Sequence, residues 1–270
     1  MKKYWIVAGL FVLSGIYLFV TAPQPLPDGI EKSQGKKISI NEVFRMLSDE
    51  NNRHRGLYTQ AVVGVGLKTG LKFDEHWEEA GIDAGPLPAL FLRGTARELE
   101  RTGLQMGLFL GSDFPIASSN KFNEAQMERH NQILASGEAQ FFFDQSSQRY
   151  TAMFPDVAVA APCVTCHNEH PQSPKHDWKL NDIMGATTWS FPSDSVTIDE
   201  ALSLIQAYRT SARSTYEKYL EKINTFSSYE VSVSNSWPSV GDWMVPSADV
   251  FCDSVYKNTS SKVLARLLSN

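Results

Sequence analysis

The chain has 270 residues, enough for one large domain or for one domain with an appendage. Hydrophobic residues make up 42% of it and aromatic residues 11%, which is enough for a packed core and excludes a disordered chain. The net charge is -5, and no basic run occurs beyond Lys2 and Lys3. A nucleic-acid-binding protein is therefore excluded, because its surface needs clustered lysine and arginine.

The first feature in chain order is an uncharged apolar run at residues 4–20, behind a short basic segment. Its length falls within the range of about 17–25 residues that cross a bilayer as a helix. The small residues after it resemble a signal-peptidase site, but Pro23 would block cleavage because proline lacks an N–H and has a fixed φ. We therefore expect residues 1–22 to be a retained signal anchor in the inner membrane, with the rest of the chain in the periplasm.

Residues 23–38 combine proline, glycine and charge, which is typical of a linker. A long helix is then predicted from Ser39, where Ser39-x-x-Glu42 can form a capping box, until the glycines at residues 64–70. Two shorter helices follow, and their ends are marked by Pro88, Gly103 and Gly137.

The apolar pattern then changes to that of strands. Residues 138–144 and 149–160 predict a hairpin joined by the polar turn QSSQ. We expect a loop after the hairpin, and then residues 183–192 predict another strand. From Thr197, which can form a second capping box, the chain is helical again and ends in a loop and a short amphipathic helix. This order predicts an α+β domain at residues 39–195 and a helical C-terminal extension at residues 196–270.

The segment AAPCVTCHNEHPQSPKHDWKLND, residues 160–182, holds two of the three cysteines and three of the six histidines. Within it, Cys163-x-x-Cys166-His167 is the attachment signature of c-type haem. Two thiols three positions apart can each add to one haem vinyl group, and the next histidine is then held under the iron. Haem c is attached outside the cytoplasm, where the expected anchor would place this segment.

Two other interpretations of the motif stay open. A disulfide between Cys163 and Cys166 suits an oxidising compartment but leaves His167 unexplained. A zinc site that adds His170 has suitable ligand types, although the adjacent Cys166 and His167 are awkward ligands for one tetrahedral ion. Haem is the interpretation that accounts for all three residues of the motif.

The segment FPDVAVAAPCVTCHNEHPQSPKHDWKLNDIMGATTWSFP resembles the haem-binding domain of the DUF3365, or Tll0287-like, family. The matching features are an apolar strand into Cys163, then Cys166-His167-Asn168, His170, Ser173-Pro174-Lys175, Asp177-Trp178-Lys179 and Gly185. The resemblance implies a PAS-like antiparallel sheet flanked by helices over residues 39–195. It also implies one haem c, linked through Cys163 and Cys166 with His167 as axial iron ligand, and a sensing or redox role.

The residue that faces His167 across the iron decides between electron transfer and gas binding. The chain has no cysteine before Cys163. The first candidate for the sixth ligand is His76, which lies nearer to where the upstream ligand of the family falls, and the second is His54 on the apolar face of the first helix. The other options are an open site or one of the following: a methionine, His130, His170 and His176.

The sequence thus predicts a membrane-anchored periplasmic haem protein, and we expect a redox or small-gas sensor. The alternative is an electron-transfer cytochrome c that docks to a respiratory complex. No catalytic constellation beyond the haem occurs in the sequence. Expected partners are a membrane-bound or periplasmic redox or signalling protein and a second copy of the chain, and nucleic acid is not among them. The lone Cys252 is either buried or pairs between chains.

Overall fold

The computed structural model describes residues 35–237 and 244–269. The expected signal anchor at residues 1–22 and most of the expected linker at residues 23–38 lie outside the described residues. Among the described residues, no helix combines the length and the apolarity that crossing a membrane requires.

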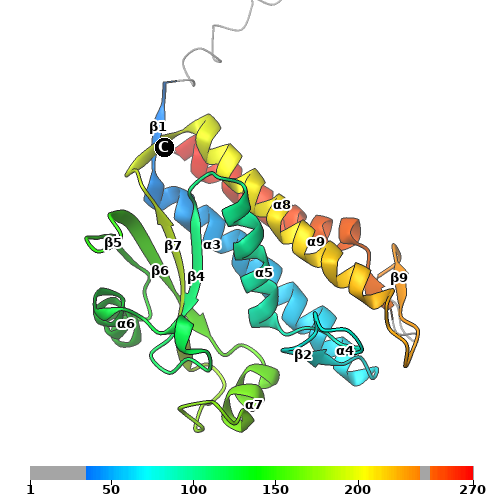
Figure 1. The fold of residues 1–270 in the computed structure, drawn as a ribbon. Helices are drawn as coiled ribbons and strands as arrows, with labels where there is room; N and C mark the ends of the chain where they lie inside the picture. The colour runs from blue at the N-terminus through cyan, green and yellow to red at the C-terminus, as the bar shows by residue number, and fades with distance from the viewer. Residues whose placement is uncertain (1–34, 238–243, 270) are drawn as a thin grey trace, which may run out of the picture. The chain divides into compact units, whose positions relative to one another are not determined.

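A four-stranded antiparallel sheet organises the fold, with the strand order β4-β7-β6-β5 (Figure 1). Its strands are β4 (Gly107–Gly111), β5 (Gln140–Asp144), β6 (Arg149–Val157) and β7 (Ile183–Phe191). The expected hairpin is β5 and β6, and the expected strand after the cysteine motif is β7, which pairs with β6. The mixed fold with an antiparallel sheet is therefore confirmed.

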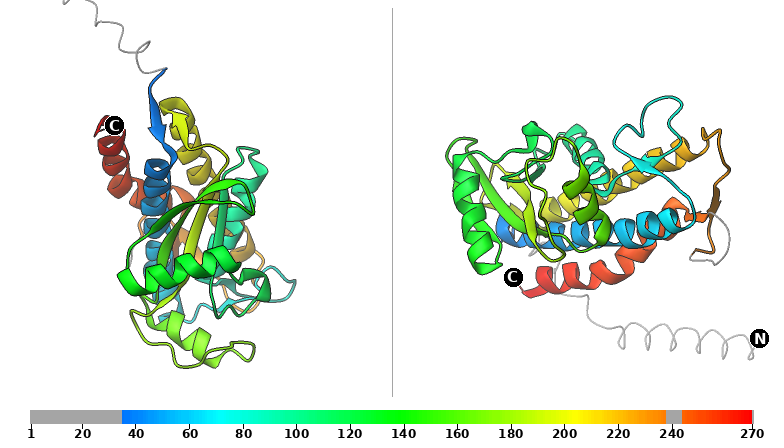
Figure 2. Two further views of the ribbon diagram at one scale, coloured as in Figure 1. Left: turned by 90° about the vertical axis from the view of Figure 1, so that its left-hand side faces the viewer. Right: turned by 90° about the horizontal axis from the view of Figure 1, so that it is seen from below.

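Helices cover both faces of this sheet (Figures 1 and 2). On one face lie α3 (Ile40–Leu57), α5 (Pro88–Arg101), α8 (Ile198–Ile223) and α9 (Ala248–Ser269). The first helix continues from α3 through a π-helical turn, η1 (Tyr58–Val63), into α4 (Gly64–Lys68). On the other face lies α6 (Glu124–Ser136).

Side chains at odd and even positions of β7 enter different cores, because successive side chains of a strand point to opposite faces of the sheet. Trp189 is buried in the largest cluster, which α3 and α8 complete with Phe44, Leu47 and Tyr208. Ala186 packs on the opposite face, against Ile133 of α6. A second helical cluster joins η1, α5, α8 and α9 through Tyr58, Phe91, Tyr216 and Phe251. The helices after residue 195 thus belong to the same compact unit as the sheet, Lys37–Asn270.

The local signals of the sequence explain most of the element ends. Pro88 begins α5, and Gly103 and Gly137, with φ of 72° and 73°, follow α5 and α6. The capping box of Thr197 with Glu200 is present at the start of α8. Each of these predictions is confirmed.

The predicted cap of α3 is only partly right. The helix begins after Ser39, whose hydroxyl accepts a hydrogen bond from the backbone N–H of Asn41 at 3.3 Å. The expected capping box with Glu42 is wrong, because the Glu42 carboxylate pairs with Arg45 at 3.4 Å and with Arg266 at 3.2 Å. These ion pairs take the side chain away from the helix terminus.

Two further predictions differ from the structure. The cysteine motif is a helix, α7 (Ala161–Glu169), where we expected a loop, and the last helix, α9, is 22 residues long where we expected a short one. Short elements without a sequence signal complete the fold. They are β1 (Lys37–Ser39) paired with β8 (Ser195–Thr197), β2 (Phe73–Asp74) with β3 (Gly85–Pro86), β9 (Ser232–Ser234) with β10 (Met244–Pro246), and the 3-10 turn η2 (Ser118–Asn120).

Candidate functional site

The helix α7 carries all three residues of the cysteine motif. Cys163, Cys166 and His167 lie at positions i, i+3 and i+4, which share one face of a helix. The helix is short and has Pro162 in its first turn, where proline is favoured because its missing N–H has no helical partner there. The structure therefore brings the two thiols and the imidazole together on one side of α7.

The segment after α7 folds back and fixes the helix in place. The amide of Asn168 forms two hydrogen bonds with the backbone of Trp178: its nitrogen donates to the carbonyl at 2.9 Å, and its oxygen accepts from the N–H at 2.9 Å. Cys163 and Val164 pack against a small core of Ala158, Trp178 and Met184. One side of α7 is thus anchored.

Both thiols of the motif are chemically available. Cys163 and Cys166 are free and partly buried, and they form no disulfide with each other. Burial raises the pKa of Cys163, and burial together with the carboxylate of Glu75 raises the pKa of Cys166. Both groups are therefore neutral thiols near pH 7, and thioether formation consumes thiols.

The imidazole of His167 also fits an iron ligand. Burial lowers its pKa, although nearby Asp156 opposes the shift, so the ring is neutral, which is the form that binds metals. Its Nδ1 atom is buried and has no hydrogen-bond partner within the described part of the chain. Two free thiols and an uncommitted neutral imidazole on one helix face are the groups that a haem c would need.

The zinc interpretation receives no support from the geometry. Among residues 35–237 and 244–269, no group of three or more His, Cys, Asp and Glu side chains is arranged to hold a metal ion. Both ring nitrogens of His170 have partners other than a metal: Nε2 lies 3.4 Å from Glu75, and Nδ1 accepts a hydrogen bond from the backbone N–H of Gln172 at 3.1 Å.

Sequence reasoning missed a partly buried ion pair next to the motif. Arg55 of α3 donates from Nη1 to Oδ1 of Asp156 at 2.7 Å, and their side chains are only 20% and 18% exposed. Burial disfavours the charge of Arg55, but the Asp156 carboxylate outweighs it and raises the pKa of the guanidinium. Asp156 lies near the end of β6, just before α7, so the pair is beside the motif. After burial, Asp156 raises the pKa of the Cys163 thiol and Arg55 lowers it. The one feature of the sequence that could have indicated this pair is Asp156 itself, an acidic residue in the apolar strand before Cys163.

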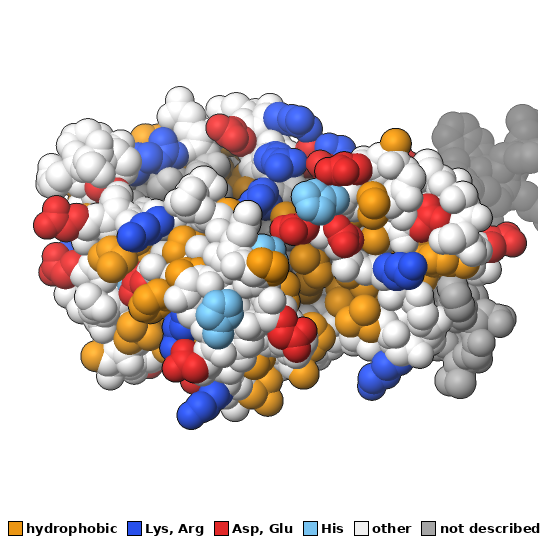
Figure 3. All heavy atoms as spheres, turned by 60° about the horizontal axis from the view of Figure 1, so that its bottom comes forward, with side chains coloured by type: hydrophobic (Ala, Val, Ile, Leu, Met, Phe, Trp, Pro, Cys, Tyr) orange, Lys and Arg blue, Asp and Glu red, His pale blue; other side chains and the backbone are white. Residues whose placement is uncertain are grey.

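The structure brings His76 to the same end of the molecule as α7. His76 is 61% exposed, and its Nδ1 atom lies 3.0 Å from a carboxylate oxygen of Glu79. One carboxylate oxygen of Glu75 lies 3.5 Å from Nε2 of His76 and 3.4 Å from Nε2 of His170, just after α7. Figure 3 turns this end toward the viewer and shows apolar side chains bordered by histidine and acidic side chains.

A comparison with protein families covers the motif and its surroundings in one match. A family model described as Tll0287-like matches residues 32–192, more than half of the chain. The chain belongs to the Tll0287-like family. No curated protein and no solved structure matches it. The Tll0287-like region includes the four-stranded sheet, α7 and the loop of His76, and it ends before α8.

The second candidate ligand of this Tll0287-like protein lies in a different place. His54 is completely buried, and its ring is surrounded by Tyr208, Phe251 and Tyr256 at centroid distances of 5.4, 6.0 and 5.9 Å. Its Nδ1 atom lies 2.9 Å from the carbonyl oxygen of Glu50. Burial lowers the pKa of His54 to about 4, so this is a neutral core histidine between α3, α8 and α9.

The other sulfur and imidazole groups have structural partners. His130 pairs with Asp113 at 3.0 Å, and His176 lies with Nδ1 2.7 Å from the carbonyl oxygen of Asn168. Cys252 is buried in the aromatic cluster with Tyr216 and Phe251, and burial raises the pKa of its thiol. Of the two expectations for Cys252, the structure supports burial.

Proposed function

We propose that this Tll0287-like protein carries one haem c, linked covalently through Cys163 and Cys166, with His167 as an axial ligand of the iron. The observation that carries the proposal is the shared face of α7, where two free thiols lie beside a neutral imidazole. A bound haem supplies a reversible one-electron centre and, where its sixth position is open, a site for a small gas.

We propose His76 as the sixth ligand. The link from His76 through Glu75 to His170 supports this assignment, because it holds the loop of His76 toward α7. His54, the second candidate, would have to leave a core of three aromatic side chains to reach an iron. Its burial therefore favours His76.

The role that the arrangement favours is a sensor of redox state or of a small gas. The helix α7 connects β6 to β7, the two central strands of a sheet that we assign to the PAS-like class. A displacement of α7 would therefore act directly on the strands at the centre of the fold. An electron-transfer cytochrome is the alternative, since the motif residues are only partly buried and would leave a haem edge accessible to a redox protein.

The location that we propose is the periplasmic side of the inner membrane, with residues 1–22 as a single-pass anchor. The apolar run at residues 4–20 and the extracytoplasmic chemistry of haem c attachment support it. The proposed partner is a membrane-bound or periplasmic redox or signalling protein, with a second copy of the chain as a further possibility.

Haem attachment is tested by producing the full chain together with a haem c maturation system. We expect pigment that survives acid–acetone extraction and gives the haem c spectrum in alkaline pyridine. The double substitution Cys163→Ser/Cys166→Ser should release all of the pigment, whereas the matched Cys252→Ser variant should retain it. A colourless wild-type protein, or one whose pigment is fully extracted, would show the proposal to be wrong.

The sixth ligand and the role are tested by absorption spectra of the reduced protein with and without carbon monoxide or nitric oxide. We expect a six-coordinate haem in the wild-type protein and an open, gas-binding site in His76→Ala. A wild-type haem that ignores both gases favours redox sensing or electron transfer, and one that binds them favours gas sensing. Unchanged spectra in His76→Ala would exclude His76 as ligand.

A further inference from the structure

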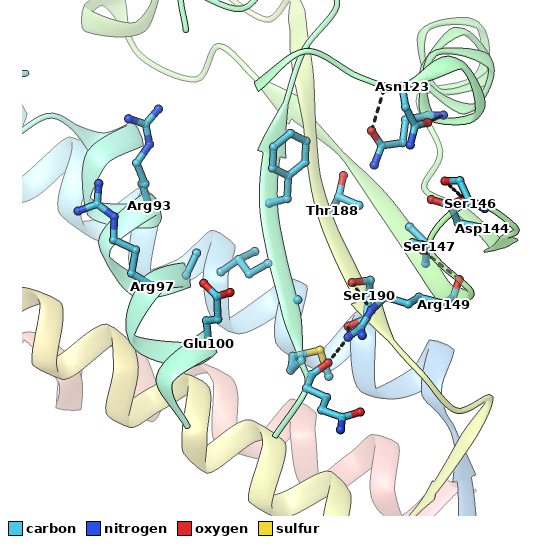
Figure 4. Close-up of a pocket in the computed structure, with 18 residues that line it drawn as sticks. Arg93, Arg97, Glu100, Asn123, Asp144, Ser146, Ser147, Arg149, Thr188 and Ser190 are labelled. Carbon is cyan, nitrogen blue, oxygen red and sulfur yellow. Dashed lines mark hydrogen bonds between the residues drawn. The ribbon is translucent and has the colours of Figure 1, made fainter. Parts of the chain in front are cut away.

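A polar groove lies on the side of the sheet that α6 covers, away from the cysteine motif (Figure 4). It is open to solvent, has a volume of about 580 Å³, and no residue of α7 lines it. Its lining comes from α5, the edge strand β4, the start of α6, the end of β5, the β5–β6 turn, the start of β6, and β7. We propose that this groove binds a small organic carboxylate, a function separate from that of the haem.

The floor of the groove contains a polar group without a partner. Thr188 of β7 lines the groove and is only 4% exposed, and its hydroxyl oxygen forms no hydrogen bond with any described residue. Ser190, two positions along the strand, lies on the same face and also lines the groove. Buried hydroxyl groups in proteins are almost always hydrogen-bonded, so Thr188 points to a ligand atom in the groove.

Beside this hydroxyl lies a cation that is held in place but not neutralised. Arg149 donates from Nε to the Ser190 hydroxyl at 3.0 Å and from Nη2 to the carbonyl oxygens of Ser190, at 3.2 Å, and Gln105. Within the described residues, no carboxylate forms an ion pair with it. The nearest strand partner, Asp144, is instead occupied by Ser146, whose N–H and hydroxyl donate to it at 2.8 and 2.7 Å.

An oriented guanidinium without a carboxylate partner is a site for an oxyanion. The Nη1 group of Arg149 is the donor that none of these bonds uses, and Figure 4 shows the Arg149 side chain lying beside Ser190 across the floor of the groove. Arg93 and Arg97 add two more cations from α5, on the other side of β4, and Arg97 also lies 3.8 Å from Glu78 outside the groove. The lining holds two acids against these three arginines, the exposed Glu100 and the buried Asp144. The charge of the groove therefore favours an anion.

The size and the apolar lining favour an organic acid over an inorganic ion. A volume of about 580 Å³ lies in the range of pockets that hold small organic molecules. Phe109 and Leu108 of β4 offer apolar contacts close to the polar floor. A carboxylate on Arg149 and Thr188, with its carbon skeleton along β4, would use both kinds of surface.

The class of ligand is tested on the full chain, produced with the haem c maturation system, by calorimetry and thermal unfolding with three carboxylates: succinate, pyruvate and benzoate. Their uncharged amides and inorganic phosphate form the comparison arms. We expect at least one carboxylate to bind one per chain and to raise Tm, while its amide does not. Binding of phosphate with no binding of a carboxylate would replace the proposed class, and binding of neither would overturn the site.

The position of the ligand is tested with Thr188→Val, which keeps the shape of the side chain. This variant should be at least as stable as the wild type, because it removes an unpaired buried hydroxyl, yet it should bind the carboxylate about tenfold more weakly. Arg149→Gln should abolish binding, and the matched Arg129→Gln, on α6 outside the groove, should not change it.

Unchanged affinity in both Thr188→Val and Arg149→Gln would overturn the proposal. The haem spectrum of each variant serves as the second measurement, and we expect it to match that of the wild type because the groove and α7 share no residue. If the haem proposal failed, the measurement of carboxylate binding would still test the groove by itself.

Discussion

At the level of single residues, the inward face of α3 carries three ionisable side chains, and each of them avoids an unpaired buried charge in its own way. Glu50 is completely buried and pairs with Arg209 of α8, and Arg55 pairs with Asp156 of β6. His54, between them in sequence, is buried without a charged partner and stays neutral. Because burial penalises charge, each side chain is either paired or uncharged. The helix α3 thereby connects the C-terminal helices to the strand that leads into α7.

The neutral state of His54 predicts a pH dependence of stability. Its pKa is about 4 in the folded protein and about 6.5 when unfolded, so the unfolded chain binds the extra proton between these values. The contribution of neutral His54 to the free energy of unfolding is fully present above pH 6.5, and it is lost as the pH drops toward 4. From pH 7 to pH 4.5, this residue alone should cost about 2.5 kcal/mol.

Urea unfolding of the wild type and of His54→Leu at both pH values measures this effect. The variant should lose less stability on acidification than the wild type, and its haem spectrum should be unchanged. An equal loss in both proteins would show that His54 does not titrate as its burial implies. An altered spectrum would instead revive His54 as an iron ligand.

The ion pair of Arg55 with Asp156 predicts a large cost for removing one partner. Arg55→Met leaves a carboxylate in a partly dry site and should lower the free energy of unfolding by about 3 kcal/mol. Arg101→Met removes an exposed arginine from Glu98, but Glu98 keeps Lys218 as a partner, so this variant should cost less than about 1 kcal/mol. The double variant Arg55→Met/Asp156→Leu should recover part of the loss in urea unfolding, and no recovery would contradict the buried-charge explanation.

At the scale of elements, α5 and α8 approach closely because one residue between them has no side chain. A Cβ atom at Gly94 would lie 2.6 Å from the Cγ2 atom of Thr215 on α8. Glycine weakens a helix interior, so its presence in α5 reflects this packing and not the local preference of the chain. By contrast, nothing lies within 4 Å of a Cβ atom placed at Gly56 in α3.

This contrast predicts opposite effects for the same substitution. Gly94→Ala should destabilise the protein by about 1–3 kcal/mol through overpacking between α5 and α8. Gly56→Ala should stabilise it by about 0.5–1 kcal/mol, because alanine is the better helix former and no atom is displaced. Thermal unfolding of the two variants measures the difference, and a stable Gly94→Ala protein would show that α8 can move away at little cost.

The sequence predicts an element well where the signal for it acts on neighbouring residues, and poorly where the element depends on distant contacts. The glycines after α5 and α6, the hairpin turn and the cap at Thr197 act on neighbouring residues, so they were readable in advance. The helix α7 was not, because none of its residues is fully buried and no apolar period marks it. It is fixed instead by the bonds of Asn168 to Trp178, ten residues away. The strand β4 reads as a continuous apolar run, GLFLG, without the alternation that identifies a strand.

The candidate site divides in the same way. Cys163, Cys166 and His167 form a contiguous motif, and the sequence alone identifies them. The Arg55 and Asp156 pair joins residues 101 positions apart, and the groove at Thr188 joins two helices and four strands, so both depend on tertiary packing. The sequence ranked His76 above His54 without knowing that one would be exposed beside α7 and the other enclosed by aromatic rings.

At the scale of the whole molecule, the region that matches the family is shorter than the unit that folds. The match ends at residue 192, yet α8 and α9 supply Tyr208, Tyr216 and Phe251 to the two largest clusters of the core. Without these helices, α3 and α5 would expose much of their apolar surface to water. The sheet and the motif therefore depend on residues beyond the family match.

A fragment of residues 35–195 should accordingly fail to fold. We expect it to lack a cooperative thermal transition by circular dichroism and to be digested rapidly by protease, whereas the chain with α8 and α9 resists. The comparison is made at equal concentration and without haem, so that cofactor binding does not mask the difference. A cooperative transition in the fragment would show that the C-terminal helices are an accessory to an independent domain.

Cys252 lies beneath the aromatic rings of Tyr216 and Phe251, out of contact with water. A disulfide between two chains through Cys252 would first require α9 to separate from the rest of the fold. A thiol-alkylating reagent applied to the native, haem-free protein should modify two of the three cysteines, Cys163 and Cys166. It should reach Cys252 only after denaturation. Packing around α9 thus leaves Cys163 and Cys166 as the accessible pair of thiols. An oxidant or the haem attachment machinery therefore cannot react with Cys252 in their place.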